Sequence, residues 1–260
     1  MKETHLFYVD ELPADNIGEL PHEEAGHAVR VLRMQEGNTL TIADGKGMFA
    51  EAEIITANPK HCRFTILRTW QDEKLWKGGI HIAVAPTKSM DRMEWFAEKA
   101  TEIGMDSLTL LNCANSERRV VKTERLDKIV VSAMKQSHKA YKPTIREMMP
   151  FAKFIHQPFD GQKYIAHCYN PSEGVENDSE EAKEPCIPKL HLSARNFLGN
   201  LLNKDDSALV LIGPEGDFSK EEVQEAIAAG FIPVSLGESR LRTETAALVA
   251  VHLMYLAKRR

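Results

Sequence analysis

The chain of 260 residues lacks the features that mark several specialised classes of protein. Its four cysteines lie far apart, with no CxxC pair and no Cys/His spacing of a metal site, which predicts reduced thiols and no bound metal. No hydrophobic run approaches the roughly 20 residues of a membrane-spanning helix, and the first residues lack the apolar core of a signal peptide. The sequence therefore predicts a cytoplasmic protein that is not inserted in a membrane.

The chain also has little net charge, −5 at pH 7, which argues against a protein that coats nucleic acid without specificity. Residues 173–184 carry six acidic side chains and one lysine, so the rest of the chain is neutral in total. This arrangement leaves room for a basic face elsewhere. The acidic stretch lies within residues 170–188, whose prolines and serines predict a solvated loop.

Two parts of the chain differ in their patterns. Short alternating segments at residues 5–9, 39–42, 48–55 and 62–67 predict strands, with one amphipathic helix at 22–34 and a hairpin turn at 44–47, which together favour a small β-barrel. From residue 78 onward strands alternate with helices, which predicts a parallel sheet covered on both faces. The expected strands are 80–85, 108–111, 165–168, 209–212 and 232–236, and the expected helices are 90–103, 122–138, 194–202 and those that follow the last two strands.

The most informative segment follows the apolar strand at residues 209–212. It turns at Gly213 and Pro214 and then enters a helix with the signature of a capping box, in which Ser219 pairs with Glu222. Such a turn lies at the carboxyl edge of a parallel sheet, where open α/β folds bind ligands. The segment is neither a phosphate loop nor a dinucleotide fingerprint, and taken alone it fits a plain strand-to-helix turn equally well.

A second turn of the same kind follows residues 232–236. Residues 237–242 form a loop, and Thr243 or Thr245 is expected to cap the next helix. Arg240 and Arg242 lie at the amino end of this helix, where the macrodipole disfavours cations. Their placement suggests a role beyond helix stability, such as holding an anion or a polar base edge. We expect the two turns to form one pocket.

At several places in order, the sequence resembles the RsmE family, bacterial 16S ribosomal RNA methyltransferases of the SPOUT superfamily that methylate N3 of a uridine. The signature loops are residues 212–223 (IGPEGDFSKEEV) and 236–247 (LGESRLRTETAA). Shorter similar segments are residues 27–33 (HAVRVLR), 88–94 (KSMDRME), 99–104 (KATEIG), 116–121 (SERRVV) and 135–137 (KQS). The resemblance covers nearly the whole chain.

The resemblance implies a PUA-like barrel at residues 1–72 and a SPOUT α/β domain with a carboxyl-terminal trefoil knot at residues 73–260. It also implies S-adenosylmethionine (SAM) as methyl donor, a homodimer, and the RNA of the small ribosomal subunit as partner. Two departures stand out. Asp217 lies where the family more often has glycine, and His138 and Lys139 replace a more usual glycine and arginine.

The expected donor-binding residues lie in the two loops and supply close backbone approach, hydrogen bonds and apolar walls. They are Leu211, Ile212, Gly213, Pro214, Glu215, Gly216, Leu236, Gly237, Ser239, Leu241 and Thr245. Core packing is the alternative for the leucines. Removing the N3 proton of uracil leaves negative charge, which Arg242 or Arg240 would stabilise. Glu244 either takes this proton or orients an arginine.

The expected RNA-binding residues are cations spread over both parts of the chain. They are Arg30, Arg33, Lys88, Arg92, Arg118, Arg119, Lys135, Lys139 and Lys142. Tyr141 lies among them and either stacks on a base or packs against the protein. Two other functions are weighed against the uridine methyltransferase. They are a ribose 2′-O-methyltransferase on a similar knotted fold, and a non-enzymatic RNA-binding or ribosome assembly factor.

Overall fold

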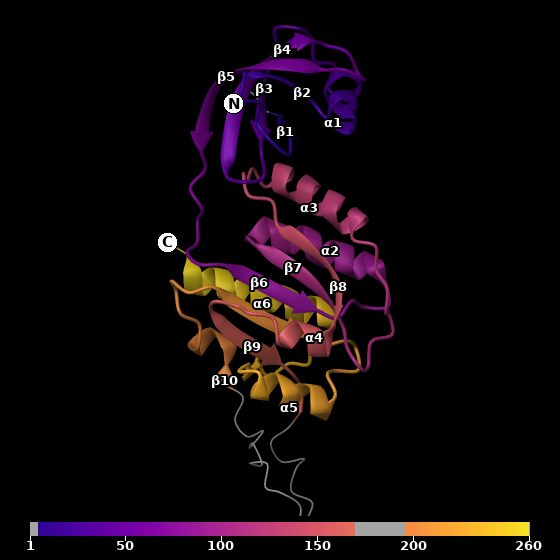
Figure 1. The fold of residues 1–260 in the computed structure, drawn as a ribbon, viewed down its shortest axis with the longest axis vertical. Coiled ribbons are helices and arrows are strands. Elements are labelled where there is room, and N and C mark those ends of the chain that lie inside the picture. The colour runs from indigo at the N-terminus through magenta and orange to yellow at the C-terminus, as the bar shows by residue number, and fades with distance from the viewer. Residues whose placement is uncertain (1–4, 170–195, 260) are drawn as a thin grey trace, which may run out of the picture. The chain divides into compact units, whose positions relative to one another are not determined.

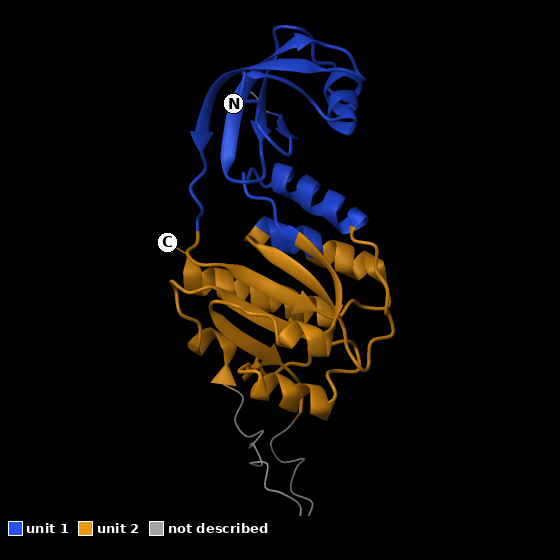
Figure 2. Cartoon of the chain, in the orientation of Figure 1, with its two compact units in different colours: residues 1–75, 97–102, 124–144 blue, residues 76–96, 103–123, 145–260 orange. Residues whose placement is uncertain are grey.

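The computed structural model describes residues 5–169 and 196–259, so the predicted loop at 170–188 lies outside the described residues. The chain forms two compact units. The first consists of residues 1–75, 97–102 and 124–144, and the second of residues 76–96, 103–123 and 145–260 (Figure 2). Each unit has its own sheet and its own core.

The first unit is built on a five-stranded sheet in the order β1-β3-β4-β5-β2. The strands are β1 (Leu6–Tyr8), β2 (Ile17–Glu19), β3 (Thr39–Ala43), β4 (Met48–Thr56) and β5 (Arg63–Gln71). β1 pairs with β3 in parallel, and the other pairs are antiparallel. Alternate residues such as Phe7, Ile42 and Phe64 are buried in one core. The expected small β domain is therefore present, with β2 as a short strand that the sequence pattern did not predict.

The helix expected at residues 22–34 is shorter and changes its winding. An α-helix, α1 (His22–Gly26), continues directly into a π-helical segment, η1 (His27–Val31). The wider turn is seen in the bond from Leu32 N to His27 O, five residues back. Arg33 then adopts a left-handed conformation with φ 55°, which ends the helix before Met34.

Helix α3 (Glu124–Gln136) belongs to this first unit although it lies far along the chain. Its Met134 packs with Ala43 and Phe49 of the sheet in one small cluster. Lys135 pairs with Glu24 of α1 through a short, half-buried contact. Helix α3 therefore makes an apolar contact with the β-sheet and an ionic contact with α1.

The second unit contains a seven-stranded sheet in the order β10-β12-β9-β11-β6-β7-β8. The strands are β6 (Ile80–Val84), β7 (Ser107–Asn112), β8 (Thr144–Pro150), β9 (Gln162–Ala166), β10 (Asn196–Phe197), β11 (Ala208–Ile212) and β12 (Ile232–Ser235). The pairs from β10 through to β7 are parallel. Every residue of β11 is buried, as expected for a central parallel strand. The predicted parallel sheet is confirmed.

Helices cover both faces of this sheet. On one face Ala83 and Leu211 pack in a core with α4 (Phe151–Ile155) and α5 (Lys220–Ala228). On the other face α6 (Thr243–Lys258) contacts β6 and β11 and crosses behind β6 in Figure 1. The carboxyl end of α6 contacts the start of the sheet, because Lys258 donates to the carbonyl of Asp206 just before β11. Helix α6 therefore begins at the carboxyl edge, as does α2 (Met90–Ile103), which follows β6.

Several expected elements differ from those observed. The strand expected at 165–168 is β9 at Gln162–Ala166, so its pairing begins three residues earlier. The helix expected at 194–202 is wrong where the structure describes it, because β10 and a 3₁₀ turn, η3 (Leu198–Asn200), occupy this stretch. β8 and α4 had no expected counterpart. Among the described residues, no helix is long and apolar enough to cross a membrane. The trefoil knot stays a prediction.

Candidate functional site at the carboxyl edge of the parallel sheet

The first signature loop leaves the sheet between β11 and α5. Leu211, Ile212, Gly213 and Pro214 are buried, whereas Glu215 and Gly216 are exposed. A Cβ atom added to Gly213 would lie 3.0 Å from the backbone nitrogen of Phe218, so the loop folds back tightly on itself. The predicted capping box is confirmed. Ser219 Oγ accepts from Glu222 N at 3.2 Å, and Glu222 Oε2 accepts from Ser219 N at 2.9 Å.

Segments that follow β6 and β7 hold this loop from the side. The backbone N–H of Lys88 donates to Glu215 Oε1 at 2.9 Å, and that of Ala114 donates to Glu222 Oε1 at 2.8 Å. Arg118 in turn donates to the carbonyl of Lys88 at 2.6 Å. Two of the expected site residues, Glu215 and Arg118, are therefore engaged in fixing loops to one another at this edge.

The second signature loop lies between β12 and α6, and strand β9 separates β12 from β11 in the sheet. Leu236 and Leu241 are half-buried, and Gly237, Ser239 and Arg240 are exposed. Gly237 has φ +126°, a conformation that favours glycine. The two loops therefore leave the same edge two strands apart.

The expected threonine cap of α6 is wrong. The N-cap residue is Arg242, in extended conformation, and its side chain makes no capping hydrogen bond. Thr243 is already the first helical residue and is buried, so its hydroxyl is one position too late to cap. The positive end of this helix thus carries an exposed arginine at the N-cap position in place of a threonine.

Glu244 is the most unusual ionisable residue of this edge. The residue is only 7% exposed, and its Oε1 lies 3.8 Å from Nε of the half-exposed Arg92 on α2. Its other oxygen, Oε2, is buried without a hydrogen-bond partner among the described residues. The Oδ1 of Asn112, at the end of β7, and Nε of Arg118 are in the same situation. Buried polar atoms are normally paired, so a set of unpaired ones at one edge makes this edge the candidate site for a polar ligand.

Some of the cations expected to contact RNA are paired with other groups of the protein, and others are exposed to solvent. In the first unit Arg30 and Arg33 are exposed and in no ion pair with described residues. In contrast, Lys135 pairs with Glu24, Lys139 donates to the carbonyl of Glu102, and Lys142 lies 2.8 Å from Asp127. Burial lowers the pKa of Lys139.

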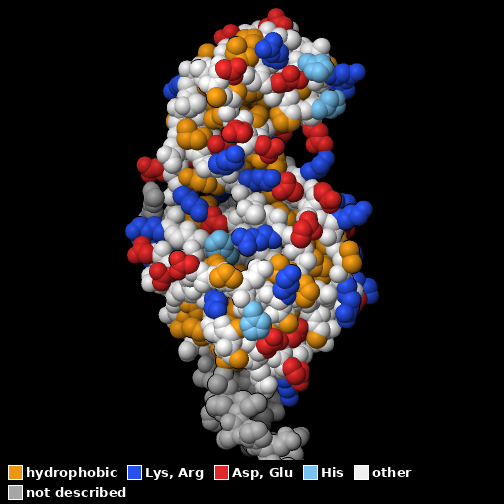
Figure 3. Space-filling view, in the orientation of Figure 1, with side chains coloured by type: hydrophobic (Ala, Val, Ile, Leu, Met, Phe, Trp, Pro, Cys, Tyr) orange, Lys and Arg blue, Asp and Glu red, His pale blue; other side chains and the backbone are white. Residues whose placement is uncertain are grey.

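In the second unit, Arg92 lies near Glu244, Lys88 Nζ lies 3.0 Å from Glu117, and Arg119 donates to the carbonyl of Ala114. Basic and acidic side chains are interspersed on the face drawn in Figure 3.

The contacts of Tyr141, in the first unit, agree with packing against the protein. Its ring fills the space beside Gly47, and its hydroxyl donates to the carbonyl of Asp72.

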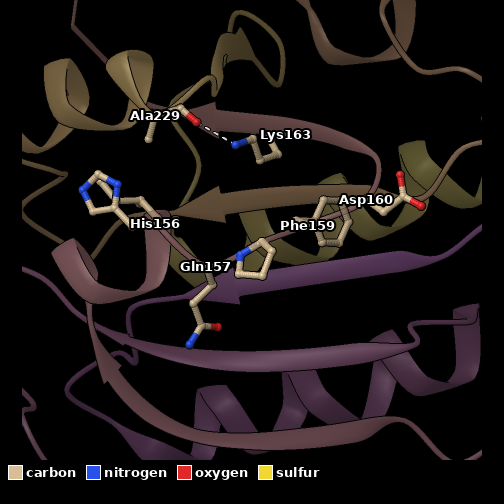
Figure 4. Close-up of a pocket in the computed structure, with 8 residues that line it drawn as sticks. His156, Gln157, Phe159, Asp160, Lys163 and Ala229 are labelled. Atoms are coloured by element: carbon tan, nitrogen blue, oxygen red, sulfur yellow. Dashed lines mark hydrogen bonds between the residues drawn. The ribbon is translucent and has the colours of Figure 1, made fainter.

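A cavity of about 730 Å³ lies elsewhere in the second unit. It is bordered by the residues after α4, by Lys163 near the start of β9 and by Ala229 after α5 (Figure 4). Lys163 Nζ donates to the carbonyl of Ala229 at 2.6 Å and lies 5.0 Å from the ring centroid of Phe231. None of its lining residues belongs to the two signature loops, and its lysine is already paired. Among the described residues, no group of three or more His, Cys, Asp or Glu side chains could hold a metal ion.

Comparison with protein families decides the relationship. The family model of an RNA methyltransferase domain matches residues 74–255, and that of an RNA methyltransferase PUA domain matches residues 20–67. The chain belongs to the RNA methyltransferase family. Both signature loops, and with them Glu244, lie inside the match to the RNA methyltransferase domain. The match to the PUA domain covers β3, β4 and most of β5 in the first unit.

Full-length relatives agree with this family. A Bacillus subtilis protein named ribosomal RNA small subunit methyltransferase E is 26% identical, over 94% of this chain and 93% of its own length. The crystal structure of a probable rRNA-methyltransferase from Porphyromonas gingivalis is 42% identical with a TM-score of 0.83, covering 97% and 98% of the two chains. A methyltransferase from Legionella pneumophila, solved with bound SAM, is 25% identical with a TM-score of 0.81 and covers 98% of both. The RsmE resemblance seen in the sequence is confirmed.

Two asparagines of this edge were missed by the sequence interpretation of this RNA methyltransferase. Asn112 ends β7, and Asn115 in the next loop donates its side-chain amide to the carbonyls of Gly216 and Asp217 at 3.3 and 3.1 Å. Their position just after a predicted strand at the carboxyl edge was the available signal.

Proposed function

We propose that this RNA methyltransferase uses SAM to methylate N3 of a uridine in the 16S ribosomal RNA of the small subunit. The observation that carries the proposal is the carboxyl edge of the sheet, where a buried oxygen of Glu244, near Arg92, has no hydrogen-bond partner within the described part of the chain and both signature loops leave the sheet. The relatives named ribosomal RNA small subunit methyltransferase E supply the substrate class. Their names do not specify the nucleotide, so N3 of uridine rests on the family resemblance.

The first signature loop fits a bulky donor that needs apolar walls and close backbone approach. Leu211 and Ile212 are buried beneath the loop. A Cβ on Gly213 or Gly216 would lie 3.0 Å from Phe218 N or 3.3 Å from Asn115 Cβ, whereas Gly237 leaves its backbone exposed. We assign donor binding to these residues together with Pro214, Glu215, Leu236, Ser239, Leu241 and Thr245. When bound, SAM supplies an electrophilic methyl group on its sulfonium.

Uracil N3 becomes a nucleophile only after its proton leaves. Glu244 is suited to accept this proton, since one of its oxygens has no other partner among the described residues. Arg242 and Arg240 are exposed at the start of α6, where they would stabilise the negative charge that develops on the pyrimidine carbonyls. The alternative role of Glu244, orienting an arginine, is supported by Arg92 at 3.8 Å.

We assign RNA capture to the domain at residues 1–72 and to cations of both units, with Arg30 and Arg33 the least committed to other contacts. A homodimer is supported by α6, whose outer side carries the half-buried Leu248, Val249 and Leu253 and the exposed Leu256. A ribosomal substrate places the protein in the cytoplasm. The SPOUT domain at residues 73–260 would carry the trefoil knot.

The test is methylation of small-subunit RNA or of small subunits from cells that lack this protein. Adding the protein and SAM should introduce one N3-methyluridine, read by nucleoside mass spectrometry and by an arrest of reverse transcription. The Gly213→Val variant serves as the control, because its Cβ would crowd Phe218 and disrupt donor binding. A methyl group on a ribose 2′-oxygen would identify the alternative chemistry. Absence of SAM binding by calorimetry would instead favour a non-enzymatic RNA-binding factor.

A further inference from the structure

Asp217 has an unusual backbone in the first signature loop. Its φ is +63°, in the left-handed region that glycine adopts readily and most other residues avoid. Its N–H donates to the carbonyl of Pro214 at 2.9 Å and closes the turn over residues 214–217. A side chain at this position must therefore compensate for the cost of the conformation.

The carboxylate of Asp217 makes two hydrogen bonds to backbone donors. Oδ2 accepts from the N–H of Cys168 at 2.7 Å, and Oδ1 accepts from the N–H of Phe218 at 2.8 Å. Cys168 follows β9, the strand that lies beside β11 in the sheet. Because a charged acceptor strengthens such bonds, the side chain fastens the signature loop to the neighbouring loop.

Side chains from two other loops donate hydrogen bonds to the backbone of residues 216–218. The Asn115 amide, from the loop after β7, donates to the carbonyls of Gly216 and Asp217. The Tyr169 hydroxyl, from the loop after β9, donates to the carbonyl of Phe218. Residues 216–218 are thus held from two sides. Phe218 adds its buried ring to the core, and Asp217 adds hydrogen bonds from its own carboxylate.

The position of residues 217 and 218 fixes the space above Gly213. A Cβ on Gly213 would lie 3.0 Å from Phe218 N and 3.2 Å from the carbonyl carbon of Asp217. Residues 217 and 218 therefore border the backbone assigned to donor binding, and their placement helps to define the space available there.

We propose that Asp217 is a positioning residue that holds the donor-binding loop in its SAM-ready shape by fastening it to the end of β9. The inference rests on the proposed function, because it concerns the same loop. The carboxylate takes no part in methyl transfer. Its effect falls on the affinity for SAM and leaves the chemical step unchanged, since preorganised loops reduce the cost of ordering on binding.

The experiment compares Asp217→Gly, Asp217→Asn and wild type. Asp217→Gly removes the backbone strain and both hydrogen bonds, and Asp217→Asn keeps a single acceptor oxygen. We expect the SAM dissociation constant to rise about tenfold in Asp217→Gly and about threefold in Asp217→Asn, as for lost hydrogen bonds to a charged group. KM for SAM should rise in parallel, while kcat at saturating SAM stays within about twofold. Without SAM, the amides of Cys168 and Phe218 should exchange with solvent about tenfold faster in Asp217→Gly.

Asn16→Gly is the matched control, because Asn16 has the same φ of 63° but lies before β2, in the other unit. It relieves the same strain and should leave SAM affinity unchanged. Unaltered exchange at Cys168, or faster exchange with wild-type SAM affinity, would overturn the inference. A fall in kcat without a change in KM would do so as well. If wild type itself fails to bind SAM, the proposed function falls and the inference with it.

Discussion

The two edges of the parallel sheet treat their buried polar groups in opposite ways. At the amino edge Lys258 is fully buried, and its ammonium donates to the carbonyls of Asn203 and Asp206. Asp106 at the same edge accepts from Trp76 Nε1 and from Ile80 N. At the carboxyl edge, buried atoms of Asn112, Arg118 and Glu244 have no partner among the described residues.

Lys258 and Asp106 stabilise the fold through paired polar groups, whereas the proposed function assigns the unpaired groups of the carboxyl edge to ligand binding. A buried unpaired acceptor costs about 1–3 kcal/mol relative to a paired one, so its retention at one edge calls for a compensating role. Burial lowers the pKa of Lys258, yet its two carbonyl partners satisfy it within the protein. Oε2 of Glu244 has no such partners in the part of the chain that the structure describes, in keeping with the proposed assignment of chemistry to its edge.

The largest effect is expected at the carboxyl edge. Glu244→Gln should lower kcat about 100-fold or more if the carboxylate accepts the N3 proton, because general bases typically contribute 10²–10⁴-fold. Arg242→Ala should lower kcat by a similar factor and leave the SAM dissociation constant within about twofold. Single-turnover methylation measures the first quantity and calorimetry the second.

Glu98→Gln is the control for this pair, since Glu98 also lies on a helix in an ion pair, with Lys99. It should leave turnover unchanged. If Glu244→Gln kept wild-type turnover while Arg242→Ala lost it, the glutamate would be an arginine anchor. Equal losses of SAM affinity and turnover in Arg242→Ala would remove that arginine from the acceptor side.

A smaller effect, on stability, is expected at the amino edge. Lys258→Met fits the buried stem but leaves the carbonyls of Asn203 and Asp206 without this donor, which should lower the free energy of unfolding by about 1–3 kcal/mol. Denaturant unfolding gives the change, and turnover per folded molecule should stay within about twofold. The exposed Lys204→Met is the matched control and should be neutral. A folded Lys258→Met with reduced kcat would contradict the contrast between the edges.

Local patterns in the sequence predicted much of this architecture. The capping box of Ser219 and Glu222, the strand over β11 and the helix over α2 depend on neighbours along the chain, and they were placed correctly. The predicted cap of α6 was wrong. The positions of the threonine hydroxyls do not reveal that the helix already includes Thr243 and that the extended Arg242 precedes it. The helix expected at 194–202 was wrong because its apolar residues serve a short edge strand and η3.

Contacts between distant segments could not be predicted from local sequence patterns. The bond from Cys168 to Asp217 spans 49 residues, and that from Asn115 to Asp217 spans 102. No periodicity encodes these pairs. The two departures from the family pattern gain a physical meaning only in the structure, since both Asp217 and His138 adopt positive φ, where a glycine is the unstrained choice.

The smallest effect, on RNA affinity, is expected for the exposed arginines of the first unit. Arg30→Ala combined with Arg33→Gln should weaken binding to small-subunit RNA about three- to tenfold and reduce its salt dependence, because each lost phosphate contact lowers the slope by about one. Lys60→Gln, an exposed lysine of the same unit outside the predicted set, should change neither quantity. Filter binding over a series of salt concentrations provides both measurements. Deleting residues 1–70 would be a poorer test, because Met134 of α3 packs against Ala43 and Phe49 and would lose its partners. An unchanged salt slope in the double variant would contradict a role of Arg30 and Arg33 in RNA capture.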